Sequence, residues 1–445
     1  MRVSIIGAGY VGIVTGVCLA EKGHQVVCVE TDAAKVERIR RGEPPIHEAG
    51  LGELLRRHTG TAFRATASIE EAVNDTDITL IAVGTPFDGR AIDLAQVTRA
   101  AKEIGNILAR KRERHVVVVK STVVPGTTDG PVREALESSS GKKAGVDFGL
   151  GTNPEFLTEG TAIADFMNPD RIVIGGIDAA TLDTLAEVYA GFDGVPVVRT
   201  NNSTAEMIKY ASNSLLATMI SFSNEIADLC SALGDIDAKD VMAGVHESAY
   251  LNTMGAGKAR ARAPIASFLE AGCGFGGSCL PKDVSALVAH GAAHGVDMHM
   301  LRSVLDINRG RPDRVLEGIA HHMPSLRGTT VAVLGLAFKP DTDDVRESPA
   351  FPIIDRLLAA GAKVTAFDPI ASEPARRALG DKAVRYAETL EGALAHADVV
   401  VLVTRWREFA AVPEILRRIG RAPLVFDGRR MLDKNTIDRY EGIGL

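Results

Sequence analysis

The glycine-rich segment from residue 272 to residue 283 contains residue types that are suited to covalent chemistry. It reads Gly-Cys-Gly-Phe-Gly-Gly-Ser-Cys-Leu-Pro-Lys-Asp, so Cys279 lies close to Lys282 and Asp283. A nearby ammonium group, or the free N–H groups at the start of a helix, favours the nucleophilic thiolate form of a cysteine. The pattern therefore predicts Cys279 as a nucleophile, and Cys273, which lacks adjacent charges, as structural. A small buried Cys279 is the alternative, because most free cysteines are buried.

A second glycine-rich segment, at the start of the chain, predicts a dinucleotide site. Gly7, Gly9 and Gly12 follow a predicted strand and open a predicted helix, where backbone N–H groups can approach a pyrophosphate. Glu30 ends the next predicted strand, at about the distance of 20 residues that is typical of a carboxylate bound to the ribose 2′-OH. This carboxylate favours NAD over NADP, and Lys35 is a further contact on the adenosine side. A glycine turn that serves packing alone is the alternative.

Polar residues elsewhere fit a site of this kind. Thr85 and Thr122 follow predicted strands, at the sheet edge where ligands of doubly wound folds bind, although they can also be simple turn caps. Lys209 and Asn213 are four residues apart, so they share one face of a predicted helix, unless they belong to a solvated stripe. A thiol next to a dinucleotide suggests the oxidation of an aldehyde through a thiohemiacetal to a thioester, which water cleaves to an acid.

Two more loops contain charged residues. Glu155 and Glu159 belong to the segment Asn-Pro-Glu-Phe-Leu-Thr-Glu-Gly, where exposed loop acids are the alternative to a functional role. Lys339 and Arg346, near the first strand of the C-terminal region, are suited to a phosphorylated ligand. Only part of a glycine fingerprint follows that strand, so a second dinucleotide is not expected to bind there in the same way.

The bulk composition limits the possible functions. A chain of 445 residues is expected to form two or three domains, and 46% hydrophobic with 24% charged residues is typical of a globular protein. The net charge of −7 argues against a nucleic-acid partner but allows a small anionic substrate. The five cysteines show no CxxC spacing, so no metal site is expected and a reducing compartment is indicated. No apolar run has the length of a membrane span and no signal-peptide pattern is present, which together favour the cytoplasm.

The hydrophobic pattern predicts three regions, residues 1–200, 201–310 and 311–445. Alternating strands and helical segments predict a doubly wound α/β domain in the first region and a second, smaller one in the last. The central region begins with a capping box at 203–206 and a helix of about 30 residues, so apolar that burial in a core or in a subunit interface is expected. The predicted buried parallel strands of the first domain are 3–6, 25–29, 78–83, 116–120 and 172–175. Those of the last domain are 330–334, 363–368, 398–403 and 424–427.

Seven motifs resemble those of the UDP-glucose/GDP-mannose 6-dehydrogenase family and cover nearly the whole chain. In chain order they are GAGYVG, VGTP, STVVPGTT, NPEFLTEG, AEMIKYASN, FGGSCLPKD and FKPDTDDVRESP. The resemblance implies two Rossmann-like domains joined by a long central helix with a helical dimerisation region, and a homodimer or a higher homo-oligomer. It also implies an NAD-dependent four-electron oxidation of the C6 hydroxymethyl group of a nucleotide sugar to a carboxylate, in which two NAD are used.

By position, the resemblance implies a role for each matching residue. Cys279 is the nucleophile, Lys209 donates to the oxyanion that develops at C6, and Asn213, Asp283 and Thr122 arrange the proton transfers and the water. The implied NAD contacts are Gly7, Gly9, Val11, Gly12, Glu30, Lys35, Thr85, Thr122, Glu159, Lys282 and Arg346. The implied sugar-nucleotide contacts are Glu155, Phe156, Leu157, Thr158, Glu159, Lys209, Asn213, Phe268, Leu269, Glu270, Ala271, Gly272, Gly276 and Lys339.

One position departs from the family pattern. The family has an arginine five residues before Phe268, which reaches the substrate of a neighbouring subunit, and this chain has Ala263 there. Arg262 and Arg260 are the nearest arginines, and either of them could make this contact after a local shift.

The resemblance leaves several substrates open. Segments 212–225 and 268–277 are similar to the UDP-glucose members and segments 142–149 and 342–349 to the GDP-mannose members. UDP-glucose is favoured over GDP-mannose and over a UDP-N-acetylhexosamine. Outside the family, a two-electron 3-hydroxyacid dehydrogenase and a non-catalytic NAD-binding sensor are the alternatives, although neither needs the cysteine segment. The yield of NADH per substrate separates these functions.

Overall fold

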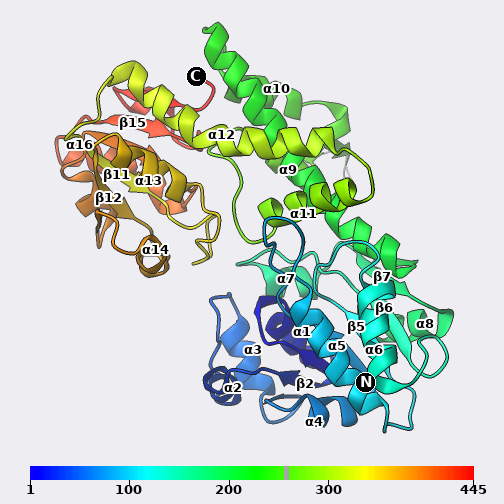
Figure 1. Cartoon of the computed structure of the whole chain (residues 1–445). Coiled ribbons are helices and arrows are strands. Elements are labelled where there is room, and N and C mark those ends of the chain that lie inside the picture. The colour runs from blue at the N-terminus through cyan, green and yellow to red at the C-terminus, as the bar shows by residue number, and fades with distance from the viewer. Residues whose placement is uncertain (255–259) are drawn as a thin grey trace. The chain divides into compact units, whose positions relative to one another are not determined.

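The computed structural model describes residues 1–254 and 260–445, which form two compact units, Met1–Ser212 and Asn213–Leu445 (Figure 1). The boundary between the units falls inside one continuous helix of 32 residues, α9 (Asn202–Leu233), which confirms the long helix predicted from the sequence. Among the described residues, no helix has both the length and the hydrophobicity that a membrane span requires.

The first unit contains an eight-stranded sheet in the order β3-β2-β1-β4-β5-β6-β7-β8. Its strands are β1 (Arg2–Ile6), β2 (Gln25–Val29), β3 (Phe63–Thr66), β4 (Ile78–Ile81), β5 (Val116–Val119), β6 (Gly149–Thr152), β7 (Ile172–Gly176) and β8 (Val197–Thr200). All five predicted strands of this unit are present. The prediction that 172–175 runs parallel to its neighbours is wrong at one contact, because β7 is antiparallel to β6 and parallel to β8. After β6 the chain enters β7 from the same edge of the sheet, so it does not cross over a face of the sheet as a parallel connection does.

Helices cover both faces of this sheet, which explains why its strands are near-continuous apolar runs. One buried cluster joins one face to α1, α2, α3, α7 and α8, and another joins the opposite face to α4, α5 and α6. The helices are α1 (Tyr10–Glu21), α2 (Ala33–Arg40), α3 (Leu51–His58), α4 (Ile69–Asn74), α5 (Ala95–Leu108), α6 (Arg133–Ser140), α7 (Ala162–Met167) and α8 (Ala179–Val188), with a short π-helical segment at Thr128–Val132. The arrangement is the predicted doubly wound fold.

The register of the parallel strands places the ends of five strands at one edge of the sheet. Ile6 is paired with Val29 on one side and with Ile81 on the other, and Ile81 is paired in turn with Val119 and Val119 with Thr152. The residues that directly follow these strands therefore form a row at the carboxyl edge of the sheet, which is where ligands of this fold bind. The row consists of Gly7, Glu30, Ala82, Lys120 and Asn153.

The second unit contains a six-stranded parallel sheet in the order β13-β12-β11-β14-β15-β16. Its strands are β11 (Thr330–Leu334), β12 (Lys363–Phe367), β13 (Val384–Tyr386), β14 (Val399–Leu402), β15 (Leu424–Asp427) and β16 (Tyr440–Gly442). All four strands predicted here are present, and a single hydrophobic core joins the sheet to the helices around it. The helices are α10 (Ala238–His246), α11 (Leu280–Ala293), α12 (His299–His322), α13 (Ala350–Ala359), α14 (Ser372–Leu379), α15 (Leu390–Leu394) and α16 (Val412–Arg418), with 3-10 turns at Ala249–Leu251, Pro264–Phe268, Arg407–Ala411 and Lys434–Thr436.

A short antiparallel pair, β9 (Asn252–Met254) and β10 (Arg260–Arg262), precedes the cysteine segment. Arg262 pairs with Glu247 at 3.4 Å.

Candidate functional site

The three glycines of the turn after β1 differ in the space around them. A Cβ on Gly7, whose φ is +104°, would lie 2.6 Å from the Ala82 carbonyl oxygen, and one on Gly12 would lie 1.9 Å from the Gly7 oxygen. A Cβ on Gly9 would meet no atom within 4 Å. The first and third glycines are therefore required by the fold itself, whereas the second leaves open space beside the N-terminus of α1. Gly9 caps this helix without a side-chain hydrogen bond, so the turn fits a pyrophosphate.

Glu30 lies at the end of β2, where a ribose-binding carboxylate is expected. The carboxylate accepts hydrogen bonds from the Asp32 N–H at 3.0 Å and the Thr31 hydroxyl at 3.3 Å, and the Lys35 ammonium is 4.0 Å away. These contacts hold a negative charge at the edge that also carries Gly7, and this charge suits a ribose diol and disfavours a 2′-phosphate. The residues present therefore fit NAD.

The loops after β4 and β5 are tied together at the same edge. The Thr85 hydroxyl donates to the Thr122 carbonyl oxygen at 2.8 Å, and the Ser121 hydroxyl donates to the Val83 carbonyl oxygen at 2.7 Å. Thr85 and Thr122, which the sequence places 37 residues apart, are thus direct neighbours.

Glu206, in the first turn of α9, anchors the second of these loops. Its carboxylate accepts hydrogen bonds from the Gly126 N–H at 2.7 Å, the Thr128 N–H at 2.9 Å and the Thr128 hydroxyl at 2.6 Å. Burial raises the pKa of Glu206 to about 7, against the opposing effect of these donors. The predicted capping box at 203–206 is wrong, because α9 begins before it, at Asn202, and the Thr204 N–H donates to Asn201 Oδ1 at 2.8 Å. The Glu206 carboxylate binds the donors at Gly126 and Thr128 instead.

Glu155 and Lys209 form a buried ion pair in the first unit. The Glu155 Oε1 and Lys209 Nζ atoms are 3.2 Å apart, and the Leu157 N–H donates to Glu155 Oε2 at 2.6 Å. Burial raises the pKa of Glu155, but the charge of Lys209 and the Leu157 hydrogen bond outweigh this effect, so its pKa is lowered overall. Loss of either partner would leave an uncompensated buried charge, at a cost of about 3–5 kcal/mol. Phe156 packs between cations, with the Arg171 guanidinium 3.9 Å and the Lys209 ammonium 5.3 Å from its ring centre.

Sequence reasoning missed a buried polar cluster next to this pair. The Lys120 ammonium donates to Asn153 Oδ1 at 2.9 Å, and the Tyr189 hydroxyl donates to the same oxygen at 2.5 Å. The available signal was weak, since it consisted of a lysine at the end of an otherwise apolar strand and an asparagine at the start of the Glu155 loop.

In the second unit, neighbouring atoms of the protein leave no room for a side chain at three glycines of the cysteine segment. A Cβ on Gly276 would lie 2.1 Å from the Glu347 carbonyl oxygen, and one on Gly277, whose φ is +80°, would lie 2.7 Å from the Phe338 ring. A Cβ on Gly274, whose φ is +92°, would lie 2.4 Å from Asn308 Oδ1. The glycines therefore allow the backbone of the cysteine segment to lie close to neighbouring loops and to α12.

Cys279 is the N-cap residue of α11 and is exposed, whereas the other four cysteines are buried. Its Sγ atom lies 3.7 Å from the Ser278 hydroxyl, and its carbonyl oxygen accepts the Asp283 N–H at 2.8 Å. Its position at the N-terminus of α11 is one that favours the thiolate form of a cysteine. The other cysteine of the segment, Cys273, is buried, as its structural interpretation predicts.

Asp283, on the first turn of α11, brings two other predicted residues together. It is 1% exposed, and it accepts a hydrogen bond from Asn213 Nδ2 at 2.6 Å while the Lys282 ammonium lies 2.5 Å from its other oxygen. Asn213 lies one helical turn from Lys209 on α9, so the predicted shared face is present.

The remaining predicted contacts lie in several separate segments of the two units. The Leu269 carbonyl oxygen accepts a hydrogen bond from His246 at 3.0 Å, and the Gly272 N–H donates to Asn224 at 2.8 Å. The Arg346 carbonyl oxygen accepts the Gly277 N–H at 3.0 Å, and its guanidinium pairs with Asp344 at 2.6 Å. Of the other predicted contacts, Val11 lies on α1, Phe268 ends a 3-10 turn, Thr158 and Glu159 follow Leu157, and Glu270, Ala271 and Lys339 lie in loops.

The glycine turn of the second sheet is occupied by a side chain of the protein. Asp368, after β12, accepts hydrogen bonds from the Leu336 N–H at 2.7 Å, the Ala337 N–H at 3.1 Å and the Trp406 indole at 3.1 Å. A carboxylate thus takes the amides that a dinucleotide phosphate would need, which supports the expectation of no second dinucleotide site of this kind.

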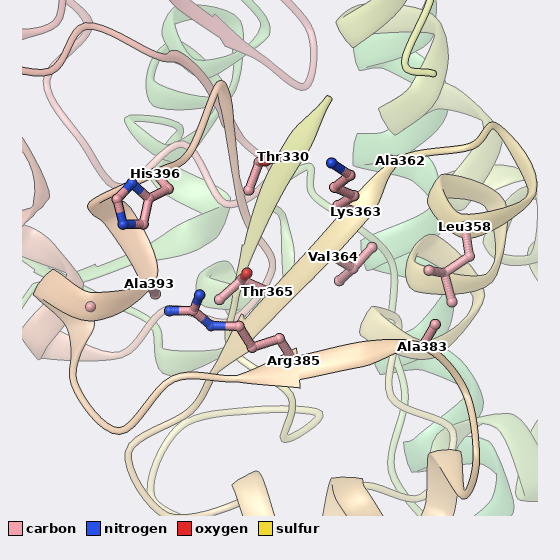
Figure 2. Close-up of a pocket in the computed structure, with 11 residues that line it drawn as sticks. Thr330, Leu358, Ala362, Lys363, Val364, Thr365, Ala383, Arg385, Ala393 and His396 are labelled. Atoms are coloured by element: carbon pink, nitrogen blue, oxygen red, sulfur yellow. The ribbon is translucent and has the colours of Figure 1, made fainter. Parts of the chain in front are cut away.

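A hollow of about 410 Å³ lies elsewhere, around the starts of β11 and β12 (Figure 2). Lys363, Arg385 and His396 reach it from three different segments, and small aliphatic residues form most of its remaining wall. None of the predicted site residues lines it, so this hollow is not the predicted site. The described residues also contain no group of three or more His, Cys, Asp or Glu residues placed to hold a metal.

Comparison with known proteins assigns the whole chain to one family. Models of the UDP-glucose/GDP-mannose dehydrogenase family match residues 1–193 as its NAD binding domain, residues 203–310 as its central domain and residues 332–434 as its UDP binding domain. The UDP-glucose 6-dehydrogenase AglM of Haloferax volcanii is 42% identical over 448 residues, which cover 100% of both chains. The GDP-mannose 6-dehydrogenase of Azotobacter vinelandii is 41% identical over 370 residues, which cover 83% of this chain and 81% of that protein.

A solved structure agrees with this assignment. A UDP-glucose dehydrogenase from Pyrobaculum islandicum is similar with a TM-score of 0.90 and 40% identity, covering 99% of this chain and 97% of that one. Both the fold and the fit of the glycine turn to a dinucleotide are those expected of this family. The chain therefore belongs to the UDP-glucose/GDP-mannose dehydrogenase family and is an NAD-dependent oxidoreductase.

Proposed function

We propose that the chain oxidises the C6 hydroxymethyl group of UDP-glucose to the carboxylate of UDP-glucuronate. Similarity to UDP-glucose dehydrogenases over the full length supports this substrate, whereas the similarity to a GDP-mannose enzyme covers 83% of the chain. The match of residues 332–434 to a UDP binding domain supports the uridine nucleotide. A different nucleotide sugar, GDP-mannose or a UDP-N-acetylhexosamine, is the alternative.

The exposed thiol of Cys279, at the start of α11, is the observation on which the chemistry depends. NAD, held at the glycine turn after β1, would supply the hydride acceptor for both oxidation steps. After the first step the Cys279 thiolate adds to the aldehyde carbon, and its addition forms a C–S bond and an oxyanion that is protonated to a thiohemiacetal. Loss of the C6 hydrogen as hydride, together with release of the hydroxyl proton, then leaves a thioester, and water cleaves its C–S bond to the carboxylate and the free thiol. The covalent link retains the aldehyde while the cofactor is exchanged.

The other residues of the site act on protons and charge. The Lys209 ammonium donates to the oxygen of C6 as negative charge develops on it. Asp283, held by Asn213 and Lys282, positions the water that cleaves the thioester together with Thr122. Glu155 keeps Lys209 in place through the buried ion pair.

The yield of NADH per nucleotide sugar tests this function. With limiting UDP-glucose and excess NAD, we expect two NADH and one UDP-glucuronate for each UDP-glucose consumed. GDP-mannose and UDP-N-acetylglucosamine, tested in parallel, are expected to react at a far lower kcat/KM. A yield of one NADH would instead indicate a two-electron dehydrogenase, and binding of NAD without NADH formation from any of the three sugars would indicate a sensor.

We also propose that the chain forms a homodimer, or a higher homo-oligomer, through α9. Five apolar side chains that remain exposed on this helix fall on one stripe, because successive members are separated by four, seven or eight residues. They are Met207, Leu215, Phe222, Leu229 and Leu233. A stripe of this kind supports burial in an interface between subunits.

A reducing compartment such as the cytoplasm suits the chain, because the proposed chemistry requires a reduced Cys279.

A further inference from the structure

Lys120 is a buried cation for which the chemistry proposed above has no role. It follows β5 at the carboxyl edge of the first sheet and is 2% exposed. Its ammonium donates to the side-chain oxygen of Asn153 at 2.9 Å and to the backbone oxygen of the same residue at 3.3 Å. A charged group in the interior is costly unless it is paired, so its presence here needs an explanation.

Asn153 connects Lys120 to the loop that carries Glu155. Its Nδ2 group donates to the Val173 carbonyl oxygen at 2.8 Å, and its Oδ1 atom accepts the Tyr189 hydroxyl in addition to Lys120. The side chain is therefore held from three directions. Because Glu155 is two residues further along the chain, this arrangement fixes the start of the loop that pairs with Lys209.

The charges of this cluster do not cancel. Lys120 and Lys209 share a single buried carboxylate, that of Glu155, which contacts Lys209 directly at 3.2 Å. Glu155 and Lys209 are the two charged groups that act on Lys120. The Tyr189 phenol stays neutral, because burial raises its pKa. With both lysines charged, the cluster has one net positive charge in an interior where electrostatic effects are strong.

We propose that Lys120 is a positioning residue for the C6 oxidation, in which its buried positive charge offsets Glu155 and leaves the Lys209 ammonium available to the oxygen of C6. This inference rests on the function proposed above. Without the charge of Lys120, Glu155 and Lys209 form a neutral pair, which stabilises a developing oxyanion less than a positively charged cluster does.

The inference gives a distinctive pH dependence. Burial lowers the pKa of Lys120 to about 8, the charge of Glu155 opposes this shift, and the like charge of Lys209 adds to it. Lys120 is therefore mostly charged near pH 7 and mostly neutral above about pH 9. Its contribution to the rate is present at the lower pH and is lost as the pH rises through about 8.

The test compares NADH formation from UDP-glucose by the wild-type chain and by Lys120→Met between about pH 6.5 and 9.5. Single-turnover rates are used, so that product release does not mask the chemical step. Near pH 7 we expect the wild type to be roughly tenfold faster, with a similar KM for UDP-glucose. Above about pH 9 the ratio of the two rates is expected to approach one, because the wild-type lysine has lost its charge.

Two further variants separate charge from packing. Tyr189→Phe removes a hydrogen bond to the same Asn153 oxygen without changing any charge, so its rate relative to wild type is expected to be independent of pH. Lys120→Gln replaces Lys120→Met if the methionine variant does not fold.

The results distinguish the two proposals. An active wild type with a Lys120→Met ratio that stays constant across the pH range overturns the role of Lys120 alone. A wild type that forms no NADH from any nucleotide sugar overturns the proposed function, and the role of Lys120 with it.

Discussion

Cys279 differs from the other cysteines of the chain in its surroundings. It caps α11, where it is exposed, next to the buried carboxylate of Asp283. Cys273, six residues earlier, is buried, and burial raises the pKa of its thiol. The same residue type is therefore available for reaction at one end of the segment and inert at the other.

Substitutions of Cys279 test the covalent step. We expect Cys279→Ala to abolish uronate formation, because no acyl link can form. In Cys279→Ser the ester that replaces the thioester hydrolyses slowly, so the acyl intermediate is expected to accumulate and to add an acyl mass to the protein in intact-protein mass spectrometry. Cys273→Ala is the control within the same segment and is expected to keep the wild-type yield of NADH. Uronate production by Cys279→Ala at the wild-type rate would contradict the covalent mechanism.

Glu30 is expected to determine the choice of cofactor. The wild-type chain should use NADP poorly, because this carboxylate repels the 2′-phosphate. Glu30→Ala loses a charged hydrogen bond to the ribose, worth about 1.5–3 kcal/mol, so kcat/KM for NAD should fall by roughly 10- to 100-fold. Glu37→Ala removes an exposed carboxylate of α2 that pairs with Arg40 and is a matched control with little expected effect. Equal kcat/KM values of the wild type for NAD and NADP would contradict this role.

At the scale of elements, the row of residues at the carboxyl edge of the first sheet follows from parallel pairing. Five strands end in register, so loops that are far apart in sequence meet there. Additional contacts then order these loops, as when Glu206 of α9 holds the backbone at Gly126 and Thr128. Glu206 and Lys209 both lie on α9, so the helix that holds the loop after Thr122 also carries Lys209.

The exposed stripe on α9 gives a prediction about assembly. Phe222→Glu places a charge in the centre of the stripe, and we expect it to shift the chain from dimer to monomer in sedimentation velocity experiments. Ser231→Glu lies on a different face of the same helix and is also exposed, so this variant should keep the wild-type assembly state. A Phe222→Glu chain that sediments like the wild type would show that the stripe is not the interface.

At the scale of the whole molecule, two sheets of the same doubly wound type have different functions. The first presents an open glycine turn, whereas the second closes its turn with Asp368. A shared fold therefore does not imply a shared ligand, and the local side chains decide which sheet accepts a dinucleotide.

Much of this arrangement was predictable from local sequence. The strands at 25–29, 330–334 and 424–427 have the predicted ends, and α9 has nearly the predicted length, because hydrophobic periodicity and the glycine that ends a helix are local properties. In the two large sheets, β3, β6, β8, β13 and β16 were not predicted, and β13 and β16 have only three residues each. β3 and β6 are short and contain few apolar residues in a row, and β8 is largely exposed.

The sequence alone determined the types of chemical group and the elements that carry them, because glycine turns, helix caps and apolar periods act over a few residues. Only the tertiary structure decided which of these groups meet, such as Lys209 with Glu155 and Asn213 with Asp283. It also revealed the buried Lys120, whose cost in the interior and whose partners depend on residues 33 or more positions away. Contacts across such separations depend on how sheets and helices pack together, and no local pattern encodes that packing.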